Sequence, residues 1–289
     1  MTEESKIIWS NLEKYSYMKI FLGNIINQRL AITDCEHGML TACLLDEPSK
    51  PDLERLDHAL QLGKSLCTNF KMIFGIGRLP QNPEQADGRI IDMLAEVKAF
   101  EFLYNWEFKD ITYLRQKADT RTVDFTARIN GDNYAIEVTR LGLPQSDTKK
   151  PVYLAKGSSP NQGILEWFLI SGSDNVPKFK KTIAAAIENE YRQVEEFCLK
   201  QSGVWKGIVI ISVGRDYFVT KYARRDLDMF PNRIRETVKD VWNMLKENQK
   251  SSYQYLHHVA VILGKTLDKV LIHPEFVSTR NGHLRPNSP

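Results

Sequence analysis

A predicted β-hairpin over residues 122–140 constrains the fold of this chain more than any other segment. Its apolar residues recur at every second position: Val123, Phe125, Ala127 and Ile129 on the first arm, then Tyr134, Ile136 and Val138 on the second. Alternation with a period of two predicts strands whose apolar face packs on a core. The arms meet at Asn130-Gly131, a dipeptide typical of a two-residue hairpin turn. The chain is therefore expected to contain an antiparallel strand pair here.

The polar face of this hairpin carries two carboxylates, on Asp124 and Glu137. With Asn130-Gly131 as the loop, these residues lie opposite each other with their Cβ atoms about 5 Å apart. A longer loop would shift the pairing by two residues, and both acids would still share one face. Like charges in opposed positions destabilise a sheet, and a bound hard cation such as Mg²⁺ would offset the repulsion. The alternative is a solvated face on which the acids have no function.

A helix is predicted over residues 89–106, where no Gly or Pro interrupts the chain. Its apolar residues recur at helical spacing: Ile90, Met93, Val97, Phe100 and Tyr104. Glu96 lies at the border of this apolar stripe, so its carboxylate is directed towards the core and needs a partner there. Glu101 lies further round the helix, and we expect it on the solvated surface.

A short strand is predicted over residues 110–114, between this helix and the hairpin. The chain thus has a helix with a glutamate, a strand, a strand with an aspartate, and a strand with Glu137-Val138-Thr139. This order resembles the PD-(D/E)XK nuclease superfamily, which has the restriction-endonuclease-like fold. The resemblance is close over residues 89–140 and extends in outline to about residue 277.

The resemblance implies a metal-dependent nuclease that hydrolyses phosphodiester bonds of DNA or RNA. Its catalytic residues would be Glu96, Asp124, Glu137 and Thr139. Asp124, Glu137 and the Val138 carbonyl would bind Mg²⁺ or Mn²⁺. Glu96 would bind a second ion or hold a metal-bound water. The ion would lower the pKa of the attacking water and neutralise charge on the scissile phosphate.

Thr139 departs from the family pattern, which has lysine at this position. Threonine cannot supply a positive charge to orient the attacking water or to stabilise charge on the phosphate. Lys98 is predicted to point away from the carboxylates, and Arg140 to project from the opposite sheet face. Arg128 is predicted to lie roughly 13 Å along the strand from Asp124. No residue of this chain is assigned the role of the family's lysine. The alternative function is therefore a catalytically inactive, nuclease-like protein that binds nucleic acid or has a regulatory role.

Charge is uneven along the chain, whose 289 residues carry a formal net charge of +3. Residues 1–88 contain nine Lys or Arg and twelve Asp or Glu, which leaves 30 basic and 24 acidic residues for 89–289. The basic excess thus accompanies the predicted site. The residues that we expect to contact nucleic acid are Lys149, Lys150, Lys178 and Lys181. For each of them, charged solvated surface is the alternative.

Two regions are predicted: a helical N-terminal region over 1–88 and a nuclease-like domain over 89–289. In the first, helices are expected over 7–30 and 52–74, followed by a connector over 75–88. This region would select substrate or mediate self-association into a homo-oligomer. The alternative is that it only extends the packing of the core.

The second region alternates strands and helices, which indicates an α/β fold with a mixed β-sheet flanked by helices. After the hairpin, the expected elements are a long connection over 142–176, helices over 178–200 and 232–248, and strands over 207–213, 258–263 and 269–273. A connection of that length inside a domain is usually functional or mobile.

The sequence lacks the features of secreted, zinc-binding and membrane proteins. Its four cysteines, at positions 35, 43, 67 and 198, form no CxxC pair and no zinc-site spacing, so reduced structural thiols are expected. No apolar run reaches the ~20 residues that span a bilayer, and the N-terminus shows no secretion-signal pattern. We therefore expect a cytoplasmic protein with no membrane partner.

Overall fold

The computed structural model describes residues 2–32, 39–45, 50–75, 77–114, 122–141, 172–213, 240–241, 253–263 and 271–272. The helices, including the short 3-10 helix η2, are α1 (Glu3–Leu12), α2 (Ser16–Leu30), α3 (Met39–Leu45), α4 (Lys50–Leu66), η2 (Phe70–Phe74), α5 (Pro83–Asn105) and α7 (Gly172–Lys200). The strands are β1 (Lys109–Tyr113), β2 (Phe125–Ile129), β3 (Asp132–Leu141), β4 (Trp205–Val213), β5 (Leu256–Leu263) and β6 (Leu271–Ile272).

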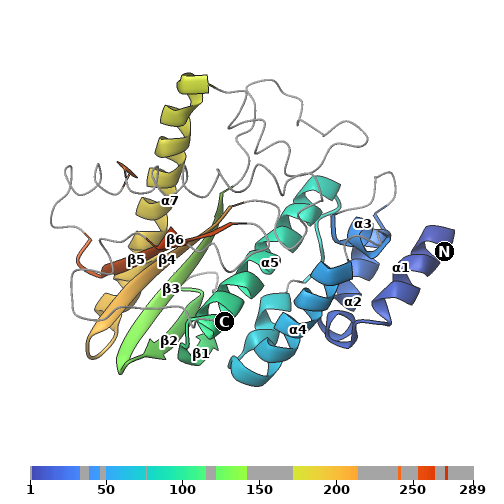
Figure 1. Ribbon diagram of the computed structural model, residues 1–289, viewed down its shortest axis with the longest axis horizontal. Coiled ribbons are helices and arrows are strands. Elements are labelled where there is room, and N and C mark those ends of the chain that lie inside the picture. The colour runs from blue at the N-terminus through green and yellow to red at the C-terminus, as the bar shows by residue number, and fades with distance from the viewer. Residues whose placement is uncertain are drawn as a thin grey trace.

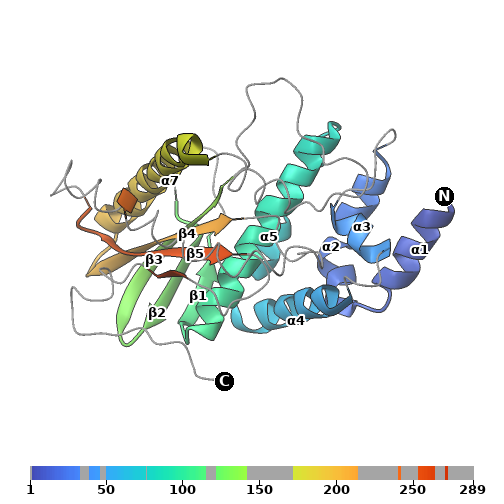
Figure 2. The same ribbon diagram turned by 45° about the horizontal axis from the view of Figure 1, so that its top comes forward.

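All of these strands belong to one sheet, in the order β1-β2-β3-β4-β5-β6. The first three pair antiparallel, β3, β4 and β5 run parallel, and β6 pairs antiparallel with β5. α5 covers one face and α7 the other, while α1, α2 and α4 lie beyond α5 (Figures 1 and 2). The predicted α/β fold, with a mixed sheet flanked by helices, is therefore confirmed. None of the helices in the described ranges has the length and apolar character needed to cross a membrane.

The hairpin forms in the register that the sequence predicts. Ile129 pairs with Asp132, so the turn consists of Asn130-Gly131 alone. The two turn residues have φ angles of 53° and 82°, and positive φ at both central positions gives a turn whose twist matches that of the strands. The same register brings Asp124, just before β2, opposite Glu137 on β3.

Both faces of the sheet are buried, each by its own apolar core. The core on the α5 face contains Phe125 and Ile136, together with the N-terminal helices. The core on the α7 face contains Ala135, Val209 and also Val123. The prediction of one apolar face that includes Val123 is therefore wrong. Residues 122–124 precede β2 and bend at Asp124, so they do not continue the alternation of the strand.

Several helix limits differ from those that the pattern predicts. The segment 7–30 divides into α1 and α2, because Tyr15 takes an extended backbone conformation with φ −117° and ψ 90°. The segment 52–74 divides into α4 and η2. The expected connector ends early, since Asn82 caps α5 and Pro83 lies in its first turn. α7 begins at Gly172 rather than at residue 178. Most of the predicted segments 142–176, 232–248 and 269–273 lie outside the described residues.

One apolar cluster joins the N-terminal helices to the sheet. It runs from Ile8 in α1 through Phe100 in α5 to Ile262 in β5. The predicted boundary between residues 88 and 89 falls inside α5, and the division into two regions stays a prediction. The packing nevertheless means that α5 is covered by the sheet on one side and by helices on another.

Ion pairs also tie α5 to the N-terminal helices. Arg29 of α2 binds Asp87 with Nε 2.8 Å from Oδ1, and Arg55 of α4 binds Glu101 with Nε 3.0 Å from Oε1. Glu101 is only 8% exposed, so the expectation of a solvated surface position is wrong. The reason is that α4 packs on the side of α5 which the sequence pattern left polar.

We expect Asp87→Asn to destabilise the protein by about 2 kcal/mol, because the buried Arg29 guanidinium then loses an anionic partner. The Arg29 side chain is 5% exposed and that of Asp87 is 28% exposed. Urea unfolding measures the change. The control is Lys19→Gln, which breaks a solvent-exposed pair with Glu13 and should cost at most about 0.5 kcal/mol. Equal effects of the two substitutions would contradict a structural role for the Arg29–Asp87 pair.

Candidate functional site

Asp124 and Glu137 hold each other in place through the backbone of the hairpin. The Asp124 N–H donates to Glu137 Oε2 at 3.2 Å, and the Val138 N–H donates to Asp124 Oδ2 at 2.8 Å. The Asp124 carbonyl accepts a hydrogen bond from the Leu114 N–H at 2.7 Å, which fixes the bend before β2. The two carboxylates are therefore positioned by main-chain donors, which are rigid compared with side chains.

Both of these acids are buried. The alternative that the sequence leaves open, a solvated polar face, does not describe them. Asp124 is 6% exposed and Glu137 is 2% exposed. α7 covers the side of the sheet that Glu137 faces, with Ile187 and Val194 packed against the strands. The acids thus stand in an environment that disfavours their charged form unless a cation compensates for it.

α7 contributes two polar residues to the same site. Gln193 Nε2 donates to Glu137 Oε1 at 3.0 Å and to Glu190 Oε2 at 2.9 Å. Glu190 is absent from the sequence-based site, but a signal for it exists. It follows the buried Ile187 by three residues, at the border of an apolar stripe, which is the same relation that identifies Glu96. The site therefore contains a fourth carboxylate.

Glu96 approaches from the opposite layer, on α5. The Tyr113 side chain donates a hydrogen bond to its carboxylate, while its Oε2 atom is buried with no hydrogen-bond partner among the described residues. The charge of Asp124 acts on Glu96, and that of Glu96 acts on Glu137. The predicted triad is thus brought together from a helix and a hairpin that lie on different layers.

Burial raises the pKa of all three predicted acids. For Glu96, burial is the main cause, the charge of Asp124 adds to it, and the pKa is about 8. For Asp124, burial is again the main cause, the Val138 N–H partly opposes it, and the pKa is about 7. The pKa of Glu137 is raised furthest, first by burial and then by the charges of Asp124 and Glu190. Without a cation, the cluster therefore retains protons at neutral pH.

The remaining predicted site residues are Thr139 and the four lysines expected to contact nucleic acid. Thr139 is half-buried on β3, two residues after Glu137. Lys181 is exposed on α7. Lys178 belongs to α7, but its side chain is outside the description, and Lys149 and Lys150 lie outside the described residues altogether. The predicted nucleic-acid contacts stay predictions.

The chemistry of the donor set fits a hard divalent ion, but its oxygens are not yet arranged as a ligand shell. Within the described ranges, no three His, Cys, Asp or Glu side chains are placed to hold an ion. Asp124 Oδ2 and both oxygens of Glu137 accept hydrogen bonds instead. Glu96 Oε2 is buried and has no hydrogen-bond partner within the described part of the chain. An ion beside it would satisfy this oxygen and offset the repulsion within the cluster.

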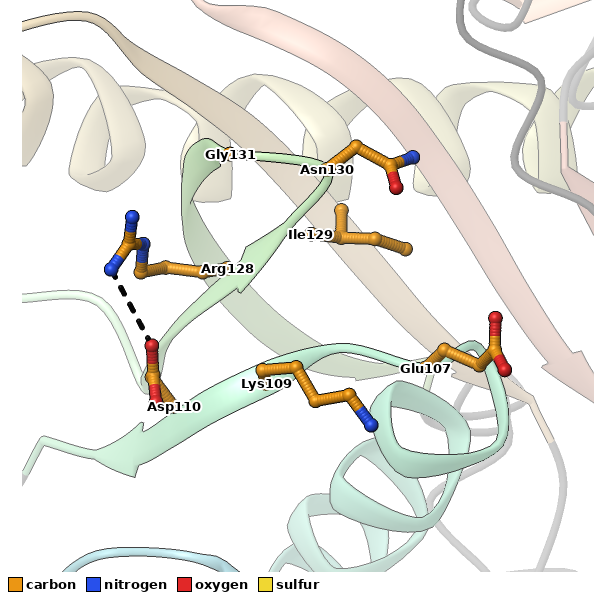
Figure 3. A pocket seen from close by; sticks show the side chains of 7 residues that line it. All are labelled: Glu107, Lys109, Asp110, Arg128, Ile129, Asn130 and Gly131. Carbon is orange, nitrogen blue, oxygen red and sulfur yellow. Dashed lines mark ion pairs between the residues drawn. The ribbon is translucent and has the colours of Figure 1, made fainter.

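A separate hollow of about 380 Å³ lies at the turn end of the hairpin (Figure 3). Four charged side chains line it: Glu107, Lys109, Asp110 and Arg128. Arg128 pairs with Asp110 across 3.6 Å, and both are largely exposed. Since the turn begins six residues after Asp124, the turn end of the hollow is roughly 20 Å along the strand from the acids. It does not form part of the carboxylate site.

Comparison of this chain with protein-family models, with curated proteins and with solved structures gave no match. What the chain does must therefore be inferred from its own residues and their geometry.

We expect the metal-free protein to become less stable as the pH rises from about 5 to about 8. Folded Glu96 and Asp124 keep protons that the unfolded chain, with carboxyl pKa values near ~4, has released. The free energy of unfolding therefore falls with pH across this window. Melting temperatures in the presence of a chelator measure the slope.

Glu96→Gln should flatten part of this slope, because the substituted side chain does not titrate. Glu13→Gln is the control, since the Glu13 side chain is 58% exposed on the surface, and it should leave the slope unchanged. An identical slope for wild type and Glu96→Gln would show that Glu96 is not a buried titrating group.

Proposed function

We propose that this chain is a metal-dependent nuclease with a restriction-endonuclease-like core, and that it hydrolyses phosphodiester bonds of DNA or RNA. The observation that supports the proposal best is that the buried Asp124 and Glu137 lie within electrostatic reach of Glu96, whose Oε2 atom is also buried. A stable fold has no need for such a cluster, because each buried carboxylate costs desolvation and repels the others. A bound divalent ion would offset both the desolvation and the repulsion of the carboxylates.

The proposed roles of the residues are those that the resemblance to the nuclease superfamily implies. Asp124, Glu137 and the Val138 carbonyl would hold Mg²⁺ or Mn²⁺ on the hairpin. Glu96 would hold a second ion or the attacking water from the side of α5. Gln193 would keep Glu137 oriented, since it donates to the oxygen that the Asp124 N–H leaves available. When bound, a divalent ion lowers the pKa of water and neutralises charge on the phosphate.

A second candidate function follows from Thr139. A threonine at this position brings no positive charge, and charge on the phosphate then has one stabilising group fewer. Loss of that charge supports a catalytically inactive protein which keeps the fold in order to bind nucleic acid or to regulate. Activity measurements on defined variants separate the two functions.

Mg²⁺ or Mn²⁺ should raise the melting temperature in proportion to binding, as mass action requires. Asp124→Asn should remove most of this gain and leave the metal-free protein equally stable or more stable, because one buried like-charge repulsion disappears. Thermal unfolding with and without the ion measures both effects. The control is Asp110→Asn on β1, near the turn end of the hairpin; its side chain is 69% exposed, and the variant should keep the full shift. A full metal-dependent shift in Asp124→Asn would remove Asp124 from the metal site.

Purified protein should cut DNA or RNA only when a divalent ion is present, and Glu137→Gln should abolish cutting while substrate binding persists. Cleavage assays and binding to labelled oligonucleotides test this. If wild type is inactive and Thr139→Lys cuts, the inactive-module function is correct and the missing ammonium is its cause. If wild type cuts and Thr139→Lys is slower, threonine belongs to a working site. Failure of both proteins to cut or to bind would contradict the nuclease proposal.

A further inference from the structure

Tyr113 of β1 is a polar residue that the sequence-based site does not contain. It is 8% exposed and belongs to the core on the α5 face of the sheet. Its hydroxyl donates a hydrogen bond to the carboxylate of Glu96. Because Glu96 Oε2 has no hydrogen-bond partner among the described residues, this bond goes to Oε1. One oxygen of Glu96 is thus held, and the other is left available.

The position of the Tyr113 side chain is fixed by contacts on both sides of β1. On the outer side, the Tyr113 N–H donates to the Thr68 carbonyl at 2.9 Å. On the inner side, Tyr113 pairs with Phe125 of β2, and the two rings meet edge to face with their centroids 5.3 Å apart. Phe125 directly follows Asp124 in the chain. The hydroxyl is therefore carried by the same strand pair that carries one of the hairpin acids.

The end of β1 also holds the backbone of Asp124. Leu114, the next residue after Tyr113, donates its N–H to the Asp124 carbonyl at 2.7 Å. Two consecutive residues thus contact two of the acids, Tyr113 through its side chain and Leu114 through its main chain. The charge of Asp124 acts on Glu96, so the two carboxylates lie within electrostatic reach of each other. This segment therefore links the acid on α5 to the acid before β2.

A carboxylate on a helix needs such a partner if it is to act on an ion. The Glu96 side chain has several rotatable bonds, and ordering them costs conformational entropy that a hydrogen bond offsets. Residues that bind metals are commonly oriented by a hydrogen bond from a second residue. A phenol is a neutral donor, so it favours the ionised carboxylate without bringing a charge that would repel a cation. The apolar core does not require the hydroxyl, because the Tyr113 ring alone supplies the contact with Phe125.

We propose that Tyr113 is a positioning residue for Glu96: its hydroxyl holds Oε1, so that Oε2 stays available to a divalent ion or to a metal-bound water. This assignment rests on the proposed nuclease function and extends its site to β1. Tyr113 acts through Glu96 and contacts neither the ion nor the substrate.

The test measures Mn²⁺ binding by isothermal titration calorimetry. Tyr113→Phe removes only the hydroxyl and should weaken Mn²⁺ binding about tenfold, the usual effect of losing a residue that orients a metal ligand. The matched control is Tyr191→Phe on α7, since Tyr191 is 4% exposed and its hydroxyl donates to Glu195 Oε1 at 3.0 Å. This variant should bind Mn²⁺ within about twofold of wild type. Equal weakening in the two variants would reflect a general loss of stability and would overturn the assignment.

A double-mutant cycle with Glu96→Gln separates positioning from packing. If Tyr113 acts through Glu96, Tyr113→Phe should change the Mn²⁺ affinity by less than about twofold once Glu96→Gln is present. Effects that simply add would show that Tyr113 acts independently of Glu96, and the assignment would be wrong.

Cleavage of a labelled oligonucleotide at saturating Mn²⁺ gives a second readout. Tyr113→Phe should lower kcat about tenfold and leave KM within about twofold of wild type, because the hydroxyl orients an acid and does not contact the substrate. A rise in KM at unchanged kcat would place Tyr113 at the substrate and contradict a positioning role.

The outcomes for Tyr113 and for the nuclease function are distinct. If wild type binds Mn²⁺ and cuts, and Tyr113→Phe does both equally well, the Tyr113 assignment is wrong and the nuclease function stands. If wild type binds Mn²⁺ without cutting, the Mn²⁺ affinities of Tyr113→Phe and Tyr191→Phe still decide the assignment. If wild type does not bind Mn²⁺, the metal-dependent function and the assignment both fail.

Discussion

Burial of several carboxylates in one place is the constraint on which the rest of this structure depends. Asp124 and Glu137 are 6% and 2% exposed, and Glu96 has a buried oxygen with no partner among the described residues. Desolvation and repulsion both oppose the ionised forms. The hairpin provides two main-chain N–H donors to the carboxylates of Asp124 and Glu137, and α7 adds the side-chain amide of Gln193, which donates to Glu137. These bonds hold the acids in place, but each is a neutral donor and brings no positive charge.

The two helical layers determine how the acids meet. α7 closes one face of the sheet over Glu137, and α5 brings Glu96 to the other side. α5 is in turn held by the N-terminal helices, through a shared apolar core and through pairs such as Arg29 with Asp87. The N-terminal helices therefore help to fix the position of α5, which carries Glu96.

Arg140 pairs with Asp92 and so ties the end of β3 to α5. Its Nη2 atom lies 4.0 Å from the position that a Cβ on Gly88 would take, which is two helical turns before Glu96. The Arg140 side chain is 28% exposed and that of Asp92 is 46% exposed, whereas Asp124 and Glu137 are buried. The pair therefore joins the sheet to α5 outside the carboxylate cluster.

The sequence by itself determined the local features of this protein. Asn130-Gly131 and the alternation of the arms set the register of the hairpin, since a two-residue turn leaves one pairing that puts apolar residues inward. Helical spacing located Glu96 at the edge of an apolar stripe. Only the tertiary structure decided that Val123 joins the second core, that Glu101 is buried, that Glu190 enters the site and that Arg140 pairs with Asp92 of α5. Periodicity reports which side of one element is apolar, whereas these four facts depend on which other element covers that side.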